Sequence, residues 1–293
     1  MAKTLFRDLF QIPHRVEVRI NVTNACNLHC DFCDHDAHLP FDGDGSKIYR
    51  RRPQVATPEA IEQFCRVLAG VGEDERHVLQ GGEITVLPVK HIVRYIDTLH
   101  AAGRCVGMRT NGYNLTAIPV SSLNKLAFIY LNSHGANNQQ AIDACHEHLK
   151  QHFRGQIILE ENYHHRDLTA YLHHRRGTVE QGLACSHLLA TLTFQPPIVH
   201  PCCNSWALMN ALNTAEMEER LIECGWTADN PNLRDTLADW RRTLPPQFLQ
   251  SFCADSCYLT APDDMGSPLY QIRPHPGDKV LKRAQADPND HLV

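Results

Sequence analysis

Hydrophobic and polar positions change along the chain in a way that predicts short strands alternating with helices. Runs of alternating or continuous apolar residues predict strands, and apolar residues at every third or fourth position predict helices. The predicted strands cover residues 16–22, 77–80, 104–109, 126–131 and 156–160. The predicted helices cover residues 57–68, 89–99 and 136–152. Strands that alternate with helices predict an α/β fold with a parallel sheet.

The first helix has a marked start. Thr57 can cap it, Pro58 stands at the first helical position, and Glu59 lies in the first turn. These residue types favour a helix N-terminus for reasons of hydrogen bonding and backbone geometry. We therefore expect the helix to begin at Thr57.

The pattern changes after residue 185. A strand is predicted over residues 191–195, followed by a turn at Pro196-Pro197, an extended segment over 198–203, and helices over 214–224 and 232–243. Beyond residue 259 the chain is polar and rich in proline. With little apolar surface to bury, this segment is predicted to lie over the surface or to be disordered.

Composition and charge narrow the class of protein. Of 293 residues, 43% are hydrophobic and 21% are charged, which is ordinary for a soluble globular protein. The net charge of −5 does not favour a nucleic-acid partner. Residues 1–15 lack the apolar core of a signal peptide, and no apolar run is long enough to span a membrane. We expect a cytoplasmic protein without a membrane partner.

The twelve cysteines are the main candidates for chemistry. In a cytoplasmic chain they indicate metal sites and free thiols rather than disulfides. Cys26, Cys30 and Cys33 directly follow the first predicted strand. Structural zinc normally has four protein ligands, whereas three thiolates on an iron–sulfur cubane leave one iron open. This spacing therefore favours an iron–sulfur cluster.

The Cys-x3-Cys-x2-Cys spacing resembles the signature of the radical S-adenosylmethionine (SAM) superfamily. Asn27-Leu28 after the first cysteine and Phe32 before the third are similar to that signature. The resemblance implies a 4Fe–4S cluster on the three cysteines, whose open iron binds SAM, with Phe32 against the adenine. It also implies reductive cleavage of SAM to a 5′-deoxyadenosyl radical, hydrogen-atom abstraction from a substrate, and a reductant such as flavodoxin or ferredoxin.

Three further motifs extend the resemblance. The run Gly81-Gly82-Glu83 is similar to the superfamily's Gly-Gly-Glu-Pro motif, which grips the SAM amino group; Ile84 replaces the proline. Thr110-Asn111-Gly112 resembles the turn after the third strand, and Asn111 is a candidate SAM contact. Ser133 follows the fourth strand, where the superfamily often has a serine on the SAM ribose or carboxylate; a serine serving only the turn is the alternative.

With these motifs, the predicted fold becomes a partial, open (β/α) barrel over residues 1–184, where the resemblance covers roughly 15–185. Residues 185–259 resemble a small α+β extension of the twitch or SPASM type, and 260–293 form the proline-rich tail. The resemblance implies a second, auxiliary 4Fe–4S cluster in the extension. Its candidate ligands are Cys185, Cys203, Cys253 and Cys257, with Cys202 as a substitute for Cys203. Structural thiols or a zinc site are the alternatives.

The function implied is that of an oxidoreductase or related tailoring enzyme acting on a small molecule such as a sugar or aminocyclitol. The auxiliary cluster would assist oxidation or position the substrate. Without such a cluster, Cys224 or whichever of Cys202 and Cys203 is not a ligand could return a hydrogen atom to the substrate radical. The runs Arg50–Arg52 and Arg109 could meet an anion. One alternative is modification of a ribosomally made precursor peptide. Another is a non-enzymatic iron–sulfur or zinc-binding protein.

Overall fold

The computed structural model of the 293-residue chain describes most of the predicted barrel and part of the C-terminal region. The described residues are 17–28, 55–67, 76–134, 138–161, 191–200, 221–223 and 225–243, with the single residues 179, 202, 219 and 250.

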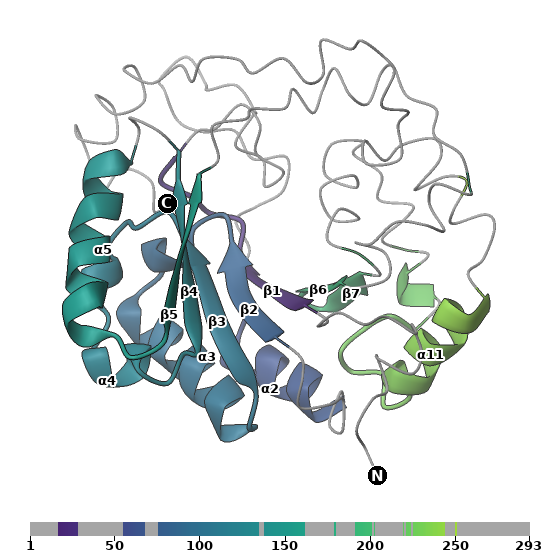
Figure 1. Cartoon of the computed structure of the whole chain (residues 1–293). Coiled ribbons are helices and arrows are strands. Elements are labelled where there is room, and N and C mark those ends of the chain that lie inside the picture. Colours follow the sequence, from purple (N-terminus) through teal and green to yellow (C-terminus); the bar gives the residue numbers. More distant parts are fainter. Residues whose placement is uncertain are drawn as a thin grey trace, which may run out of the picture.

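A seven-stranded sheet forms the centre of the described structure (Figure 1). Its strand order is β5-β4-β3-β2-β1-β6-β7. Every neighbouring pair is parallel except β6 and β7, which are antiparallel. The two edge strands β5 and β7 are not paired with each other, so the sheet is open. The strands are β1 (Glu17–Thr23), β2 (Arg76–Gly81), β3 (Cys105–Thr110), β4 (Phe128–Ser133), β5 (Gln156–Glu161), β6 (Thr191–Gln195) and β7 (Ile198–His200).

The helices that connect the first five strands lie along one side of the sheet (Figure 1). The predicted cap of the first of them is confirmed, because Thr57 Oγ1 accepts a hydrogen bond from Ala60 N (3.1 Å). The helices are α2 (Pro58–Val67), α3 (Val89–Ala101), α4 (Val120–Leu123), α5 (Gln139–His152) and, beyond β7, α11 (Leu233–Thr243); short 3-10 turns are η1 (Ile84–Val86) and η2 (Leu115–Ala117). None of the helices in the described part of the chain is long and apolar enough to cross a bilayer.

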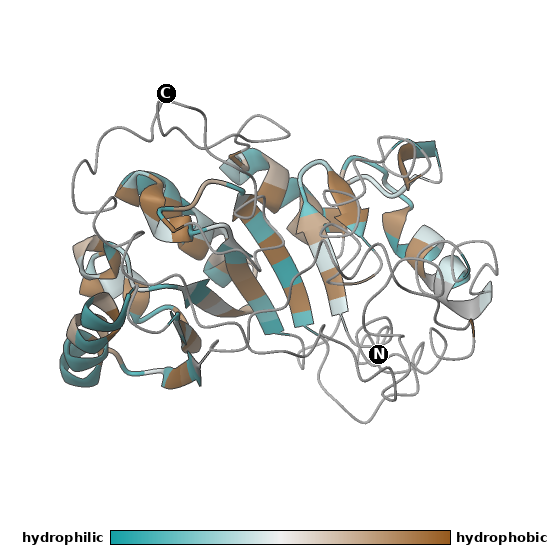
Figure 2. Cartoon of the chain, turned by 90° about the horizontal axis from the view of Figure 1, so that it is seen from above, coloured by the Kyte–Doolittle hydropathy of each residue, from teal (hydrophilic) through white to brown (hydrophobic). Residues whose placement is uncertain are grey.

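The main hydrophobic core lies between the sheet and these helices. Alternate residues of β1 point into it, namely Val18, Ile20 and Val22, all fully buried. They belong to one cluster with residues of the covering helices, among them Ile61 and Ile96. Figure 2 shows the resulting alternation of hydrophobic and hydrophilic positions along the central strands. In β1 the period-two sequence pattern follows burial from Glu17 to Ile20, whereas β2, β4 and β6 bury consecutive residues.

The opposite, inner face of the sheet has a different character. Its apolar cluster is small and consists of Val78, Phe128 and Tyr130, with Cys105 and Ile158 packed against it. Many of the other residues pointing to this face are polar. The inner face therefore holds hydrogen-bonding groups as well as a small apolar surface.

The hairpin after residue 190 joins the same sheet. The predicted strand over residues 191–195 is β6, and it pairs in parallel with β1, from Glu17 opposite Thr191 to Ile20 opposite Phe194. Phe194 then stacks on Phe64 of α2, with ring centroids 4.2 Å apart. The predicted division between residues 184 and 185 lies outside the described residues and stays a prediction.

Replacement of Phe194 by alanine is expected to lower the free energy of unfolding by roughly 3–5 kcal/mol, because it empties a fully buried position that links β6 to α2. Urea unfolding followed by circular dichroism measures this loss. Leu159→Ala on β5 is the control, since Leu159 is 51% exposed and its truncation should cost about 0.5 kcal/mol or less. Equal losses in both variants would contradict the described position of β6.

Candidate functional site

The predicted site residues meet where the first three strands of the sheet end. Cys26 follows β1, Glu83 follows β2, and Asn111 follows β3. These strands are parallel neighbours, so their carboxyl ends lie at one edge of the sheet. In open α/β folds this edge is where ligands bind.

Gly81 and Gly82 bring the end of β2 against the backbone that leads to Cys26. Gly82 N donates to Thr23 O (2.8 Å), and Glu83 N donates to Ala25 O (2.7 Å). A Cβ atom at Gly81 would lie 2.1 Å from Thr23 O, and one at Gly82 would lie 2.3 Å from Ala25 O. The glycines are therefore required for the contact between two strand ends, whether or not they also approach a ligand.

Glu83 is a buried carboxylate that accepts four hydrogen bonds. Its Oε1 accepts from Thr85 N (3.0 Å), Thr85 Oγ1 (2.7 Å) and Thr110 Oγ1 (2.7 Å), and its Oε2 accepts from Asn111 N (2.6 Å). Its side chain also caps the turn η1. The single bond to Oε2 leaves that oxygen with capacity for another donor.

Burial and hydrogen bonding act in opposite directions on the pKa of the Glu83 carboxyl. Burial raises the pKa of this carboxyl, against the effect of the four hydrogen bonds, which favour the charged form. Among the residues that the structure describes, Glu83 forms no ion pair with a basic side chain. Buried carboxylates are normally paired with a cation. A cationic ligand group such as an ammonium would fit this position.

Asn111 connects the end of β3 to the cysteine loop. Its Nδ2 donates to Asn27 Oδ1 (2.9 Å) and lies 4.0 Å from Cys26 Sγ. Leu28 N donates to the same sulfur (3.4 Å). The sulfur of Cys26, the first predicted cluster ligand, therefore faces one hydrogen-bond donor from its own loop and one from the turn after β3.

Ser133 lies at the end of β4, and its hydroxyl donates to Gln139 Oε1 (3.1 Å). A contact of Ser133 with SAM stays a prediction. Asn138, which the sequence did not single out, is the residue that joins the ends of β3 and β4. Its Nδ2 donates to Asn111 O and to Asn132 O, both at 2.8 Å. The sequence pattern placed Asn138 inside the predicted helix over residues 136–152, whereas α5 begins at Gln139, so no signal for this role was read from the sequence.

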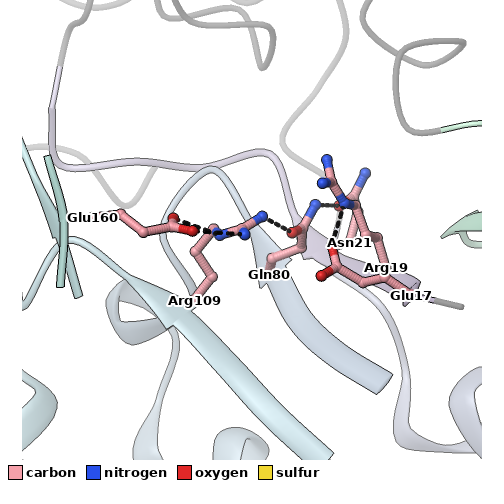
Figure 3. A network of polar contacts seen from close by, with 6 residues as sticks. All are labelled: Glu17, Arg19, Asn21, Gln80, Arg109 and Glu160. Atoms are coloured by element: carbon pink, nitrogen blue, oxygen red, sulfur yellow. Dashed lines mark hydrogen bonds and ion pairs between the residues drawn. The ribbon is translucent and has the colours of Figure 1, made fainter. Parts of the chain in front are cut away.

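A polar network crosses the inner face below this edge (Figure 3). Arg109 pairs with Glu160 of β5 (Nε to Oε2, 3.3 Å) and donates to Gln80 Oε1 (3.0 Å). Gln80 Nε2 in turn donates to Asn21 Oδ1 (3.0 Å). The Arg109 guanidinium also lies over the ring of Tyr130, 4.6 Å from its centroid. The network thus links β1, β2, β3 and β5.

A second ion pair lies on the same face, toward the amino-terminal end of β1. Arg19 Nε is 2.6 Å from Glu17 Oε1, and both side chains are about one fifth exposed. The two pairs, Arg19 with Glu17 and Arg109 with Glu160, each combine opposite charges. The described residues of the inner face therefore combine two ion pairs and amide groups with one further guanidinium, that of Arg76 over the ring of Phe128.

Two further cysteines lie in the hydrophobic core. Cys65 on α2 and Cys145 on α5 are buried. Burial raises the pKa of each thiol to about 11, so both are protonated and unreactive near neutral pH. Cys145 Sγ donates to Gly112 O (3.0 Å), which fixes α5 to the turn after β3.

Several predicted site residues lie outside the described part of the chain. These are Cys30, Phe32 and Cys33 of the first cysteine loop, the basic run 50–52, Cys224, and Cys185, Cys203, Cys253 and Cys257 of the predicted extension. Within the described residues no three metal-binding side chains come together. Cys202, the substitute ligand, is partly buried against the main core.

The fold and this edge define a class of protein: an open, mostly parallel α/β barrel whose candidate site lies between Cys26 of the cysteine loop and the buried carboxylate of Glu83. Residues 20–157 match the family model of the radical SAM superfamily. This part of the chain therefore belongs to the radical SAM superfamily. The superfamily implies a 4Fe–4S cluster and SAM as cofactors, and the first cysteine loop and Glu83 have donor types that fit them.

The curated relatives are similar over a limited part of the chain. A probable GTP 3′,8-cyclase of Methanothermobacter marburgensis is 32% identical over 106 residues, which are 36% of this chain and 30% of that protein. The GTP 3′,8-cyclase of Aquifex aeolicus is 24% identical over 140 residues, 46% of this chain and 41% of that protein. The chain thus spans well under half the length of these relatives.

Solved structures give a weaker likeness. SuiB of Streptococcus suis bound to S-adenosylmethionine has a TM-score of 0.38 at 11% identity, over 86% of this chain and 75% of that one. The enzyme anSMEcpe with bound AdoMet and a Cp18Cys peptide has a TM-score of 0.33 at 17% identity, over 50% of this chain and 42% of that one.

Proposed function

We propose that this chain is a radical SAM enzyme that binds SAM at the carboxyl edge of β1, β2 and β3 and acts on a small polar molecule over the inner face. The observation that carries the proposal is Glu83, a buried carboxylate beside the cysteine loop with no basic partner among the described residues. The amino group of SAM carries a positive charge that would complement this carboxylate.

The cysteine loop supplies the metal ligands in this proposal. Cys26, Cys30 and Cys33 would hold the 4Fe–4S cluster, and Phe32 would contact the adenine of SAM. When bound, the cluster and SAM supply a carbon radical able to remove a hydrogen atom from the substrate. The protein's own part is to hold SAM against the cluster and to keep the reacting carbon in place.

In this proposal the residues at the end of β2 bind the methionine part of SAM. Gly81 and Gly82 fix Glu83 to the backbone that leads to Cys26, through the hydrogen bond from Glu83 N to Ala25 O. A carboxylate held in place before the ligand arrives loses little entropy on binding it. This arrangement favours the binding of an ammonium group close to the cysteine loop.

The residues of the inner face indicate which kind of substrate the site would accept. Of its described guanidinium groups, Arg19 and Arg109 are paired with Glu17 and Glu160, and Arg76 lies over the ring of Phe128. The amides of Asn21 and Gln80 add donors and acceptors. Such a surface favours an uncharged or weakly charged polar substrate, for example a sugar or aminocyclitol.

A nucleotide is the second candidate, and the curated relatives favour it. Two of them are GTP 3′,8-cyclases by name, and the better matched is 32% identical to this chain over 106 residues. A triphosphate would need several basic side chains. The run Arg50–Arg52 could provide them from outside the described residues.

An auxiliary cluster on Cys185, Cys203, Cys253 and Cys257 is part of the proposal. Iron analysis with Mössbauer spectroscopy on the anaerobically reconstituted protein tests it. About eight irons per chain, falling to about four in the triple variant Cys26/Cys30/Cys33→Ala, would support two cubanes. About four irons in the wild type and none in the variant would leave the C-terminal cysteines without a cluster.

The activity is tested by incubating the reduced, reconstituted protein with SAM and measuring 5′-deoxyadenosine. We expect formation by the wild type, with dithionite or reduced flavodoxin as electron donor, and a loss of at least a hundredfold in Cys26→Ala. Stimulation by a sugar or aminocyclitol supports the first candidate, and stimulation by GTP the second. Stimulation by a peptide alone would overturn both, and a loaded cluster without any cleavage would indicate an iron–sulfur protein that is not an enzyme.

A further inference from the structure

Asn111 is held in one orientation by its neighbours. Its backbone N donates to Glu83 Oε2 (2.6 Å), and its backbone O accepts from Asn138 Nδ2 (2.8 Å). Its side-chain Oδ1 accepts from Tyr113 N (3.0 Å). The residue is 4% exposed. Because Oδ1 must face a backbone N–H, the Nδ2 group must point the other way.

The Nδ2 group of Asn111 points at the cysteine loop. One of its two protons serves Asn27 Oδ1 at 2.9 Å, and Cys26 Sγ lies 4.0 Å from the same nitrogen. That separation is at the long limit for an N–H···S hydrogen bond to a protonated thiol. A cysteine that ligates iron is a thiolate, which is a much better acceptor, and charge-assisted hydrogen bonds are shorter and stronger than neutral ones.

We propose that Asn111 is a positioning residue that donates a hydrogen bond to the Cys26 thiolate and thereby raises the reduction potential of the bound cluster. The inference rests on the proposed function, since it requires the cluster at Cys26. The step concerned is the transfer of one electron from a low-potential reductant to the oxidised cluster. Reduction adds negative charge to the cluster and its sulfurs, and a hydrogen-bond donor stabilises that charge.

This role differs from the SAM contact that the sequence motif suggested for Asn111. In the described structure the amide donors of Asn111 are directed at Asn27 and Cys26. An effect on the cluster should then be present before SAM binds. A residue that serves only SAM would leave the potential of the SAM-free cluster unchanged, so the two roles can be separated by experiment.

The test is a redox titration of the SAM-free, reconstituted protein, followed by the electron paramagnetic resonance signal of the reduced cluster. Asn111→Leu keeps the size of the side chain but removes the donor. We expect its equilibrium constant for reduction to fall by up to tenfold, which for a one-electron couple is about 59 mV toward more negative potential. Asn111→Asp keeps an acceptor for Tyr113 N and adds negative charge near the sulfur, so it should lower the potential further.

Asn132→Leu is the matched control, because it makes the same change at the end of the neighbouring strand β4. We expect its potential to equal that of the wild type. If the cluster in the Asn111 variants has the same reduction potential as the cluster in Asn132→Leu, the inference is overturned. If neither Asn111 variant assembles a cluster, the test is made on wild-type protein labelled with ¹⁵N in its asparagine side chains. A reduced cluster that shows no ¹⁵N hyperfine coupling in this protein would also overturn the inference.

Failure of this inference is distinguishable from failure of the proposed function. If the wild type forms no cluster, or forms one that does not cleave SAM, the proposed function fails. If the wild type forms a cluster and cleaves SAM while the Asn111 variants keep its potential, the proposed function stands and only the role of Asn111 is wrong.

Discussion

Gly82→Ala is expected to prevent stable binding of iron at the first cysteine loop and to lower the free energy of unfolding by roughly 3 kcal/mol. The added Cβ would lie 2.3 Å from Ala25 O and 2.7 Å from Asn24 O. Both oxygens belong to backbone, so no side-chain rotation can relieve the overlap. The ends of β1 and β2 must separate, which moves the segment that leads to Cys26.

Iron content after anaerobic reconstitution and urea unfolding measure these two effects. Gly103→Ala is the control: a Cβ there has no neighbour within 4 Å, although its φ of +68° carries a backbone cost of about 1 kcal/mol. We expect the control to bind as much iron as the wild type. If Gly82→Ala behaves like Gly103→Ala, the close contact between these strand ends does not exist.

Glu83→Gln is expected to weaken SAM binding by roughly 30-fold or more, because removing one member of a buried charge pair costs about 2–5 kcal/mol. The amide also replaces an acceptor by a donor in a position surrounded by four donors. Equilibrium dialysis of SAM against the reconstituted protein measures the dissociation constant. Glu160→Gln, which changes a carboxylate already paired with Arg109, should leave SAM affinity unchanged.

The same carboxylate predicts how SAM affinity depends on pH. Burial raises the pKa of Glu83 above its ordinary value of 4.5 in the absence of a cation. Since the ammonium of SAM pairs with the charged form, affinity should be full above this raised pKa and should fall as the pH drops through it. In Glu83→Gln that acid limb should vanish. An unchanged acid limb in the variant would assign the titration to another group.

Local features of the fold could be predicted from the sequence because they depend on near neighbours. The cap at Thr57 follows from capping chemistry, and the strands that became β1 to β5 follow from alternating or continuous apolar runs. The position of β6 did not follow. Its pattern indicated a strand, but its pairing with β1 depends on contacts between distant segments that no local pattern encodes.

The same limit applies to the site. The motif at residues 81–83 marked Glu83 as important, yet it did not indicate that the glycines pack on the Thr23–Ala25 backbone. The bonds from Thr110 and Asn111 to Glu83 arise only once β2 and β3 are in register. Asn138 was missed for this reason as well, since its partners lie after β3 and on β4.

The most direct test of the central claim is electron–nuclear double resonance on the reduced, reconstituted protein with SAM labelled in its amino group with ¹⁵N and in its carboxylate with ¹⁷O. We predict hyperfine coupling of both labels to the cluster in the wild type, and loss of the cluster signal in Cys26→Ala. A wild-type protein that holds its cluster and binds SAM but shows neither coupling would contradict the assignment of the site at the ends of β1, β2 and β3.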